Sequence, residues 1–257
     1  MQMPRRKFVK VMAGSVATGI AISGPLAAAA DRPAIKAILF DAFPIFDPRP
    51  VLNLMEQLRP GHGAELMNLW RTRQFEYTWL RSLGGQYQDF WKVTQDALIF
   101  ASAGLKIDLS AAEQRQLMDA HLSLKPWPDV PAALQSLQHA GLRLGFLSNF
   151  TPAMLASCIK NSGLDGVFEH VLSTDAARTY KPDPKAYQLG VDALKLAREE
   201  VVFAAFAGWD AAGAKWFGYP TYWVNRLQTP TEELGVKPDA TMPTLTELQT
   251  RVLGKRG

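Results

Sequence analysis

The chain has 257 residues, of which 47% are hydrophobic and 20% are charged, and its formal net charge is +4. This composition is typical of a globular chain that is large enough for one sizeable hydrophobic core. The basic residues are scattered, and part of their excess lies near the two ends of the chain, so we expect no nucleic-acid partner. The single cysteine, Cys158, excludes an intramolecular disulfide, and the four histidines lack zinc-ligand spacing.

The first thirty residues have the order of an export signal. Arg5 and Arg6 precede the weakly apolar run VMAGSVATGIAISGPL, which is too short to span a bilayer comfortably, and small residues follow at Ala29 and Ala30. This order resembles a twin-arginine signal peptide. The resemblance implies export by the twin-arginine machinery, cleavage near Ala29 or Ala30, and a mature periplasmic domain from about Asp31. The alternative is the basic start of an ordinary N-terminal helix.

After this segment, apolar runs of strand length alternate with helix-length amphipathic segments. The runs are continuous rather than alternating, which is typical of strands that are covered on both faces. Strands in this arrangement predict an α/β fold with a doubly wound parallel sheet. The predicted strands are residues 34–40, 142–148, 170–174, 201–207 and 221–225.

A long insert without a convincing strand separates the first two runs. Its segments 64–83 and 87–105 carry apolar residues at helical spacing, so we expect an inserted helical cap at residues 48–125. The core domain would then consist of residues 34–47 and 126–257. We interpret most aromatic residues of the insert as core packing, including Trp79, Phe90 and Trp91.

Polar side chains follow four of the predicted strands. Asp41 ends the first, Ser148 and Asn149 end the second, Lys181 lies in the loop beyond the third, and Asp210 follows the fourth. Ligands of doubly wound sheets bind at the carboxyl ends of the strands, so these side chains are expected to meet in one crevice. Each residue alone also has an explanation in turn or helix-start chemistry. Their corresponding positions favour a shared site.

The segments LFDAF, LSN, YKPDPKAY and WDAAGA resemble the four motifs of the haloacid dehalogenase (HAD) superfamily. The segments 69–83 and 217–226 resemble its metal-independent (S)-2-haloacid dehalogenases, known as type II. The resemblance covers nearly all of the chain after the signal and implies a HAD-like core with a cap. Phosphatases of the superfamily have a second aspartate where this chain has Phe43, and Asp210 is followed by AAGA. The chain thus lacks oxygen ligands for Mg²⁺, and we expect no metal or cofactor.

The resemblance also implies a reaction. Asp41 would attack C2 of a 2-haloalkanoate to form an ester with inversion at carbon, and water would then release the 2-hydroxy acid. Lys181 would be the cationic partner of Asp41, Asp210 would orient Lys181 and help activate the water, and Ser148 would hydrogen-bond Asp41 or the substrate carboxylate. Further side chains are implied to bind the substrate or the halide, or to support the site: Arg71, Asn149, Trp209, Phe43, Phe75 and Tyr187. Without the family, Arg71 would be interpreted as a solvated helix residue and Tyr187 as a packed one.

Three positions depart from the family's pattern. Ile45 replaces a threonine, and Ala205 and Ala207 replace a serine and an asparagine. Three functions therefore remain open. The favoured one is an exported haloacid dehalogenase that forms a homodimer, as is common among the relatives. The second is a HAD-fold hydrolase for another substrate, with a phosphatase as its weakest form, and the third is a non-catalytic binding protein.

Overall fold

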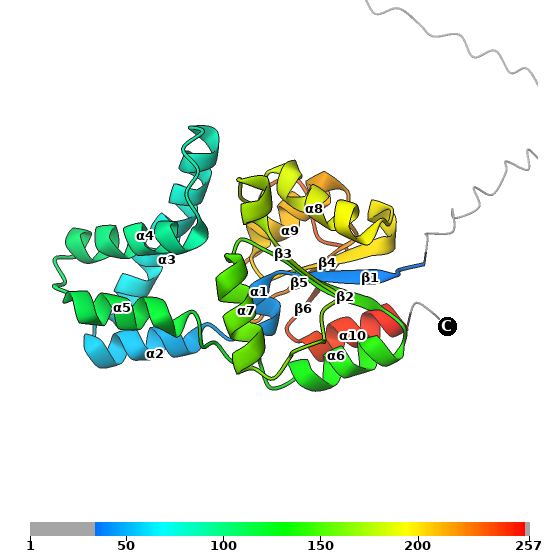
Figure 1. Cartoon of the computed structure of the whole chain (residues 1–257), viewed down its shortest axis with the longest axis horizontal. Coiled ribbons are helices and arrows are strands. Elements are labelled where there is room, and N and C mark those ends of the chain that lie inside the picture. The colour runs from blue at the N-terminus through cyan, green and yellow to red at the C-terminus, as the bar shows by residue number, and fades with distance from the viewer. Residues whose placement is uncertain (1–33, 255–257) are drawn as a thin grey trace, which may run out of the picture. The chain divides into compact units, whose positions relative to one another are not determined.

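A six-stranded sheet is the centre of the fold (Figure 1). The computed structural model describes residues 34–254, so the predicted export signal lies outside the described residues. The strand order is β3–β2–β1–β4–β5–β6, and every pairing is parallel, which confirms the predicted fold class. The strands are β1 (Ala37–Phe40), β2 (Arg143–Ser148), β3 (His170–Ser173), β4 (Val201–Ala205), β5 (Thr221–Val224) and β6 (Ala240–Met242).

Helices cover both faces of the sheet (Figure 1). Alternate residues of β1 belong to different clusters: Ile38 and Phe40 pack with the core beneath α6 and α10, whereas Ala37 and Leu39 pack with the core beneath α8 and α9. Burial on both faces explains the continuous apolar runs of the sequence. The helices of this part are α6 (Val130–His139), α7 (Pro152–Asn161), α8 (Pro184–Leu194), α9 (Gly208–Phe217) and α10 (Leu245–Leu253), with short 3₁₀ turns at η1 (Thr174–Ala177) and η2 (Arg198–Glu200).

The segment between β1 and β2 is helical, as expected. After the short helix α1 (Ala42–Ile45), it forms α2 (Arg49–Leu58), α3 (Gly63–Leu83), α4 (Phe90–Gly104) and α5 (Ala111–Ala120), which pack on one another (Figure 1). The chain leaves and re-enters the sheet-containing part side by side, where Phe46 and Pro126 form an antiparallel bridge. The boundaries of a separate cap domain at residues 48 and 125 stay a prediction.

The sequence missed β6, because this strand has three residues and only one of them is buried. No helix within residues 34–254 is long and apolar enough to cross a membrane.

Candidate functional site

The site begins at Asp41, where β1 ends. The Asp41 backbone N–H donates to the Ala204 carbonyl at 3.0 Å, so the β1–β4 pairing fixes the position of this residue. Asp41 is the N-cap of α1, and its Oδ2 accepts from the Phe43 N–H at 3.3 Å. The acid therefore ends the strand for two reasons: it caps the next turn, and it presents a carboxylate at the carboxyl edge of the sheet.

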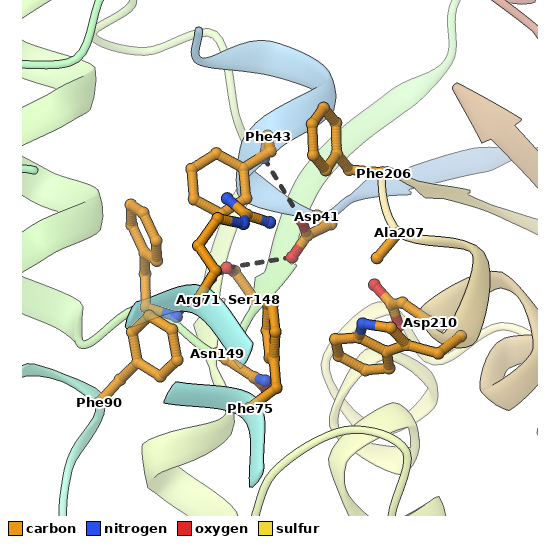
Figure 2. A pocket seen from close by; sticks show the side chains of 12 residues that line it. Asp41, Phe43, Arg71, Phe75, Phe90, Ser148, Asn149, Phe206, Ala207 and Asp210 are labelled. Atoms are coloured by element: carbon orange, nitrogen blue, oxygen red, sulfur yellow. Dashed lines mark hydrogen bonds between the residues drawn. The ribbon is translucent and has the colours of Figure 1, made fainter. Parts of the chain in front are cut away.

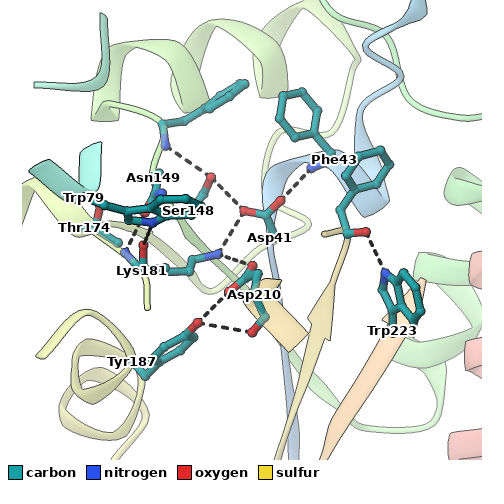
Figure 3. A network of polar contacts seen from close by, with 12 residues as sticks. Asp41, Phe43, Trp79, Ser148, Asn149, Thr174, Lys181, Tyr187, Asp210 and Trp223 are labelled. Carbon is teal, nitrogen blue, oxygen red and sulfur yellow. Dashed lines mark hydrogen bonds and ion pairs between the residues drawn. The ribbon is translucent and has the colours of Figure 1, made fainter. Parts of the chain in front are cut away.

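Lys181 joins the two carboxylates of the site (Figure 3). Its Nζ donates to Asp41 Oδ1 at 2.9 Å and to Asp210 Oδ2 at 2.8 Å, and the lysine side chain is 1% exposed. Burial by itself would lower the pKa of Lys181, but the two carboxylates outweigh it and raise the pKa above the ordinary value. The ammonium therefore stays charged and fixes the distance between the two acids.

Asp210 and Tyr187 form the buried end of this network (Figure 3). The Tyr187 hydroxyl donates to Asp210 Oδ1 at 2.7 Å, and neither side chain has appreciable contact with solvent. Burial raises the pKa of Asp210 to about 6, against the opposing effect of Lys181, and the charge of Asp41 adds to the rise. Burial also raises the pKa of Tyr187, which thus stays a donor. Asp210 changes its charge within the physiological range.

Ser148 and Asn149 enter from the end of β2. Ser148 Oγ donates to Asp41 Oδ1 at 3.3 Å. Asn149 Oδ1 accepts from the backbone N–H of Lys181 and from Thr174 Oγ1, both at 3.2 Å. Because these two donors occupy the amide oxygen, the amide nitrogen of Asn149 is the end that remains for the pocket, where it can donate to an anion.

A narrow pocket lies in front of Asp41 (Figure 2). Its cavity volume is about 20 Å³, which is room for a single water molecule. The twelve residues that line it are Asp41, Phe43, Arg71, Phe75, Phe90, Ser148, Asn149, Phe150, Phe206, Ala207, Trp209 and Asp210. Every predicted site residue except Lys181 and Tyr187 is among them, and those two support the carboxylates from behind.

Arg71 reaches this pocket from α3. Its guanidinium carbon lies 5.4 Å from the centre of the Phe43 ring and 5.6 Å from that of Phe75. Within the described part of the chain it makes no hydrogen bond or ion pair. Burial lowers the pKa of Arg71, although the charge of Asp41 opposes this. An arginine stays charged in proteins nonetheless, so the guanidinium is an unpaired cation that faces the pocket.

More aromatic residues contact the site than the sequence predicted. Phe90 is buried, as expected, but its ring also lines the pocket. Trp79 does not pack only within the insert: its Nε1 donates to the Lys181 carbonyl at 3.3 Å, and its ring lies 5.5 Å from that of Trp209. Phe150 and Phe206 were missed, although both follow the ends of strands, which is a signal that points to this edge.

The three departures from the family pattern fall in different places. Ile45 and Ala205 are completely buried and do not line the pocket, whereas Ala207 does. Only one of the three replacements thus makes the pocket wall less polar. Among residues 34–254, no group of three or more His, Cys, Asp and Glu side chains is placed to hold a metal ion.

Comparisons with known proteins agree with this geometry. Residues 8–218 match the family model described as "haloacid dehalogenase-like hydrolase". An (S)-2-haloacid dehalogenase of Pseudomonas sp. (strain YL) is 42% identical over 80% of this chain and 89% of the relative. A crystal structure of an L-2-haloacid dehalogenase, 42% identical, superposes with a TM-score of 0.84 and covers 86% of this chain and 100% of its own.

A second solved structure carries a trapped reactant. It is the L-2-haloacid dehalogenase of Xanthobacter autotrophicus with chloropropionic acid covalently bound, which is 34% identical with a TM-score of 0.79, over 86% of this chain and 99% of that one. The family model and these relatives each cover most of the chain. The chain therefore belongs to the haloacid dehalogenase-like hydrolases, within the family of the (S)-2-haloacid dehalogenases.

Proposed function

We propose that this enzyme hydrolyses (S)-2-haloalkanoic acids to (R)-2-hydroxyalkanoic acids through an ester on Asp41. The observation that carries the proposal is the pairing of a carboxylate, held by a buried lysine, with an unpaired guanidinium at one narrow pocket. A carboxylate nucleophile needs a fixed cation behind it, and a departing halide needs a cation or N–H donors in front of it. Lys181 provides the first charge from behind Asp41, and Arg71 provides the second from the pocket wall.

The first step is a displacement at C2. Asp41 Oδ1 accepts hydrogen bonds from Lys181 and Ser148, whereas among the described residues Oδ2 accepts only the long bond from the Phe43 N–H. Oδ2 therefore keeps the more available lone pairs, and we assign it the attack. The new C–O bond forms as the carbon–halogen bond breaks, and the halide leaves with the bonding electrons. No proton is required, which fits the presence of Phe43 where a phosphatase has an acid.

The halide is received by donors that have no other partner among residues 34–254. The Arg71 guanidinium and the amide nitrogen of Asn149 both face the pocket. The edges of the aromatic rings nearby carry partial positive charge and add weaker contacts. Because these donors stabilise the anion that forms only as the bond breaks, they lower the barrier more than they strengthen substrate binding.

The second step is hydrolysis of the ester. Water attacks the carbonyl carbon of the Asp41 ester. The bond between this carbon and the alkoxy oxygen then breaks, which releases the 2-hydroxy acid and restores the carboxylate of Asp41. Asp210, which is hydrogen-bonded to Lys181 and is ionised above its pKa of about 6, accepts the water proton and passes it to the departing alkoxide oxygen, which leaves as the hydroxyl of the product. Lys181 stays beside Oδ1 and stabilises the negative charge of the tetrahedral intermediate.

We further propose that the reaction needs no metal, that the chain is exported to the periplasm, and that it forms a homodimer. Halide departure without a general acid supports the first. The segment from Arg5 to Ala30 supports export by the twin-arginine machinery. Exposed apolar side chains on α3 and α4 support the dimer, because their burial would be favourable: Leu80, Leu83, Ile99 and Phe100. Cell fractionation and analytical ultracentrifugation test export and dimer formation.

The test of the function is halide release from chloroacetate and (S)-2-chloropropionate, with chiral analysis of the 2-hydroxypropionate, with and without EDTA. We expect release of halide, the (R)-product and no effect of EDTA. Asp41→Asn is the blank, because an amide is a poor nucleophile, and it should release nothing. Undiminished release by Asp41→Asn would contradict the proposal, and Mg²⁺-dependent release of phosphate from phosphate esters would favour a phosphatase.

A further inference from the structure

Aromatic rings form half of the pocket lining. Six of the twelve lining side chains carry rings, namely Phe43, Phe75, Phe90, Phe150, Phe206 and Trp209 (Figure 2). The polar part of the lining includes Arg71, Ser148 and Asn149, and the Arg71 guanidinium lies beside the rings of Phe43 and Phe75. The cavity is about 20 Å³, smaller than any 2-haloacid. A substrate therefore fits closely against these rings, and a larger one has to move them.

Phe206 is the part of the wall on the core side, and it is firmly held. Its ring centre lies 5.4 Å from that of Phe43, which in turn lies 5.2 Å from that of Phe150. The Phe206 carbonyl accepts from Nε1 of the buried Trp223 at 2.8 Å. The side chain is 7% exposed. A ring that is braced by neighbours and by its own backbone yields little space without disturbing several residues at once.

Phe75 is the corresponding part of the wall on α3. Its ring centre lies 5.0 Å from that of Trp209 and 6.2 Å from that of Trp79, and the two tryptophan rings lie 5.5 Å apart. These three rings brace one another across the contact between α3 and the start of α9. The pocket is consequently narrowed by packed rings from two directions, and its size is set by the rings rather than by a mobile polar side chain.

The geometry of the displacement places the C2 substituent against this wall. During the attack, C2 carries the carboxylate, the halogen, one hydrogen and one further substituent. The halogen faces Arg71 and Asn149, and the attacking oxygen comes from Asp41. Because rings make up half of the lining, the further substituent contacts them. In a haloacetate this substituent is hydrogen, whereas in 2-chloropropionate and 2-chlorobutanoate it is a methyl and an ethyl group.

We propose that Phe206 and Phe75 are specificity-determining residues that make this enzyme prefer haloacetates to 2-haloacids with a longer chain. The inference rests on the proposed function, since it concerns the substrate of the same Asp41 site. Each added carbon has to force two braced rings apart. One methylene changes kcat/KM by roughly 10- to 200-fold in pockets that discriminate by size.

The test compares kcat/KM for chloroacetate, (S)-2-chloropropionate and (S)-2-chlorobutanoate with the whole chain. We expect a fall of at least about tenfold at each added carbon. Phe206→Ala and Phe75→Leu should each reduce this fall at least about threefold, by raising kcat/KM for the longer acids relative to chloroacetate. Phe206→Leu is the milder variant if Phe206→Ala does not fold. Phe100→Leu, on the exposed side of α4, is the control and should keep the original ratios.

The ratio between substrates separates specificity from a loss of folding, because unfolding lowers all three rates equally. Similar kcat/KM values for the three acids in the unmodified chain would overturn the inference and leave the proposed function intact. Unchanged ratios in both Phe206→Ala and Phe75→Leu would remove these residues from the role. Absence of halide from all three acids would refute the proposed function and this inference together.

Discussion

The substitution Tyr187→Phe should change the pKa of Asp210 while the carboxylate keeps its place beside Lys181. The Tyr187 hydroxyl donates to Asp210 Oδ1 at 2.7 Å and thereby favours the ionised carboxylate. A hydrogen bond to a charged group is worth about 1.5–3 kcal/mol, and one pKa unit corresponds to about 1.4 kcal/mol. Removing the hydroxyl should thus raise the pKa of Asp210, now about 6, by about one to two units.

The sign of the effect on activity follows from the role of the carboxylate as a base. Asp210 acts when ionised, so activity increases with pH through its pKa and is lost below it. In the unmodified chain the acid limb should have its midpoint near 6. In Tyr187→Phe we expect this midpoint to move up by about one to two units, so that activity is low at pH 7 and recovers towards pH 9.

The assay is the dependence of kcat and of kcat/KM on pH, with halide release as the readout. Tyr219→Phe is a matched control, because the Tyr219 hydroxyl is also buried but donates to the Tyr187 carbonyl at 2.8 Å instead of to the carboxylate. This variant should lose stability without any movement of the acid limb. An unmoved midpoint in Tyr187→Phe, with activity reduced equally at all pH values, would refute the assignment of that limb to Asp210.

Three further substitutions test the surroundings of the site. Lys181→Met leaves the buried Asp210 and the partly buried Asp41 without their cation, so we expect a loss of about 3–5 kcal/mol in the free energy of unfolding at pH 8 and a smaller loss at pH 5, measured by chemical denaturation. Equal stability at both pH values would contradict this. In Gly213→Ala the new Cβ would lie 2.5 Å from the Tyr187 hydroxyl, so its pH profile should shift as in Tyr187→Phe; an unshifted profile would mean that the tyrosine accommodates the methyl group. Ala207→Asn should change kcat, whereas Ala205→Ser should change stability only, because Ala207 alone of the two lines the pocket; the reverse pattern would place the relevant wall elsewhere.

The polar members of the site could be predicted from the sequence because of a rule of parallel sheets. All strands of such a sheet point the same way, so residues that follow different strands arrive at one edge. Asp41, Ser148, Lys181 and Asp210 lie far apart in the chain, and the structure joins them by hydrogen bonds. The helices of the insert could be predicted for a similar reason, since apolar residues at helical spacing indicate one buried face.

Contacts that depend on how elements pack could not be predicted in this way. The aromatic residues of the insert have the same periodicity whether they face their own helices or the pocket, so Phe90 and Trp79 were interpreted as packing alone. Phe206 follows an apolar strand and resembles its continuation, although its ring lies beside Phe43. The volume of the pocket depends on how all of these side chains pack together, so it cannot be predicted from any single position in the sequence.

The effect of the three apolar replacements depends on whether each residue lines the pocket. Ile45 and Ala205 lie in the core, so their replacement of polar side chains removes buried polar groups without altering the pocket lining. At Ala207 the wall carries a methyl group where the resemblance implies an amide. A cavity of about 20 Å³ that is surrounded by rings holds little water, and charges interact more strongly where water is excluded. The attraction of Arg71 for a departing halide is strengthened by the same exclusion. The network of Asp41, Lys181 and Asp210 is complete, so the replacements favour an enzyme with a tighter pocket over one that has lost its chemistry.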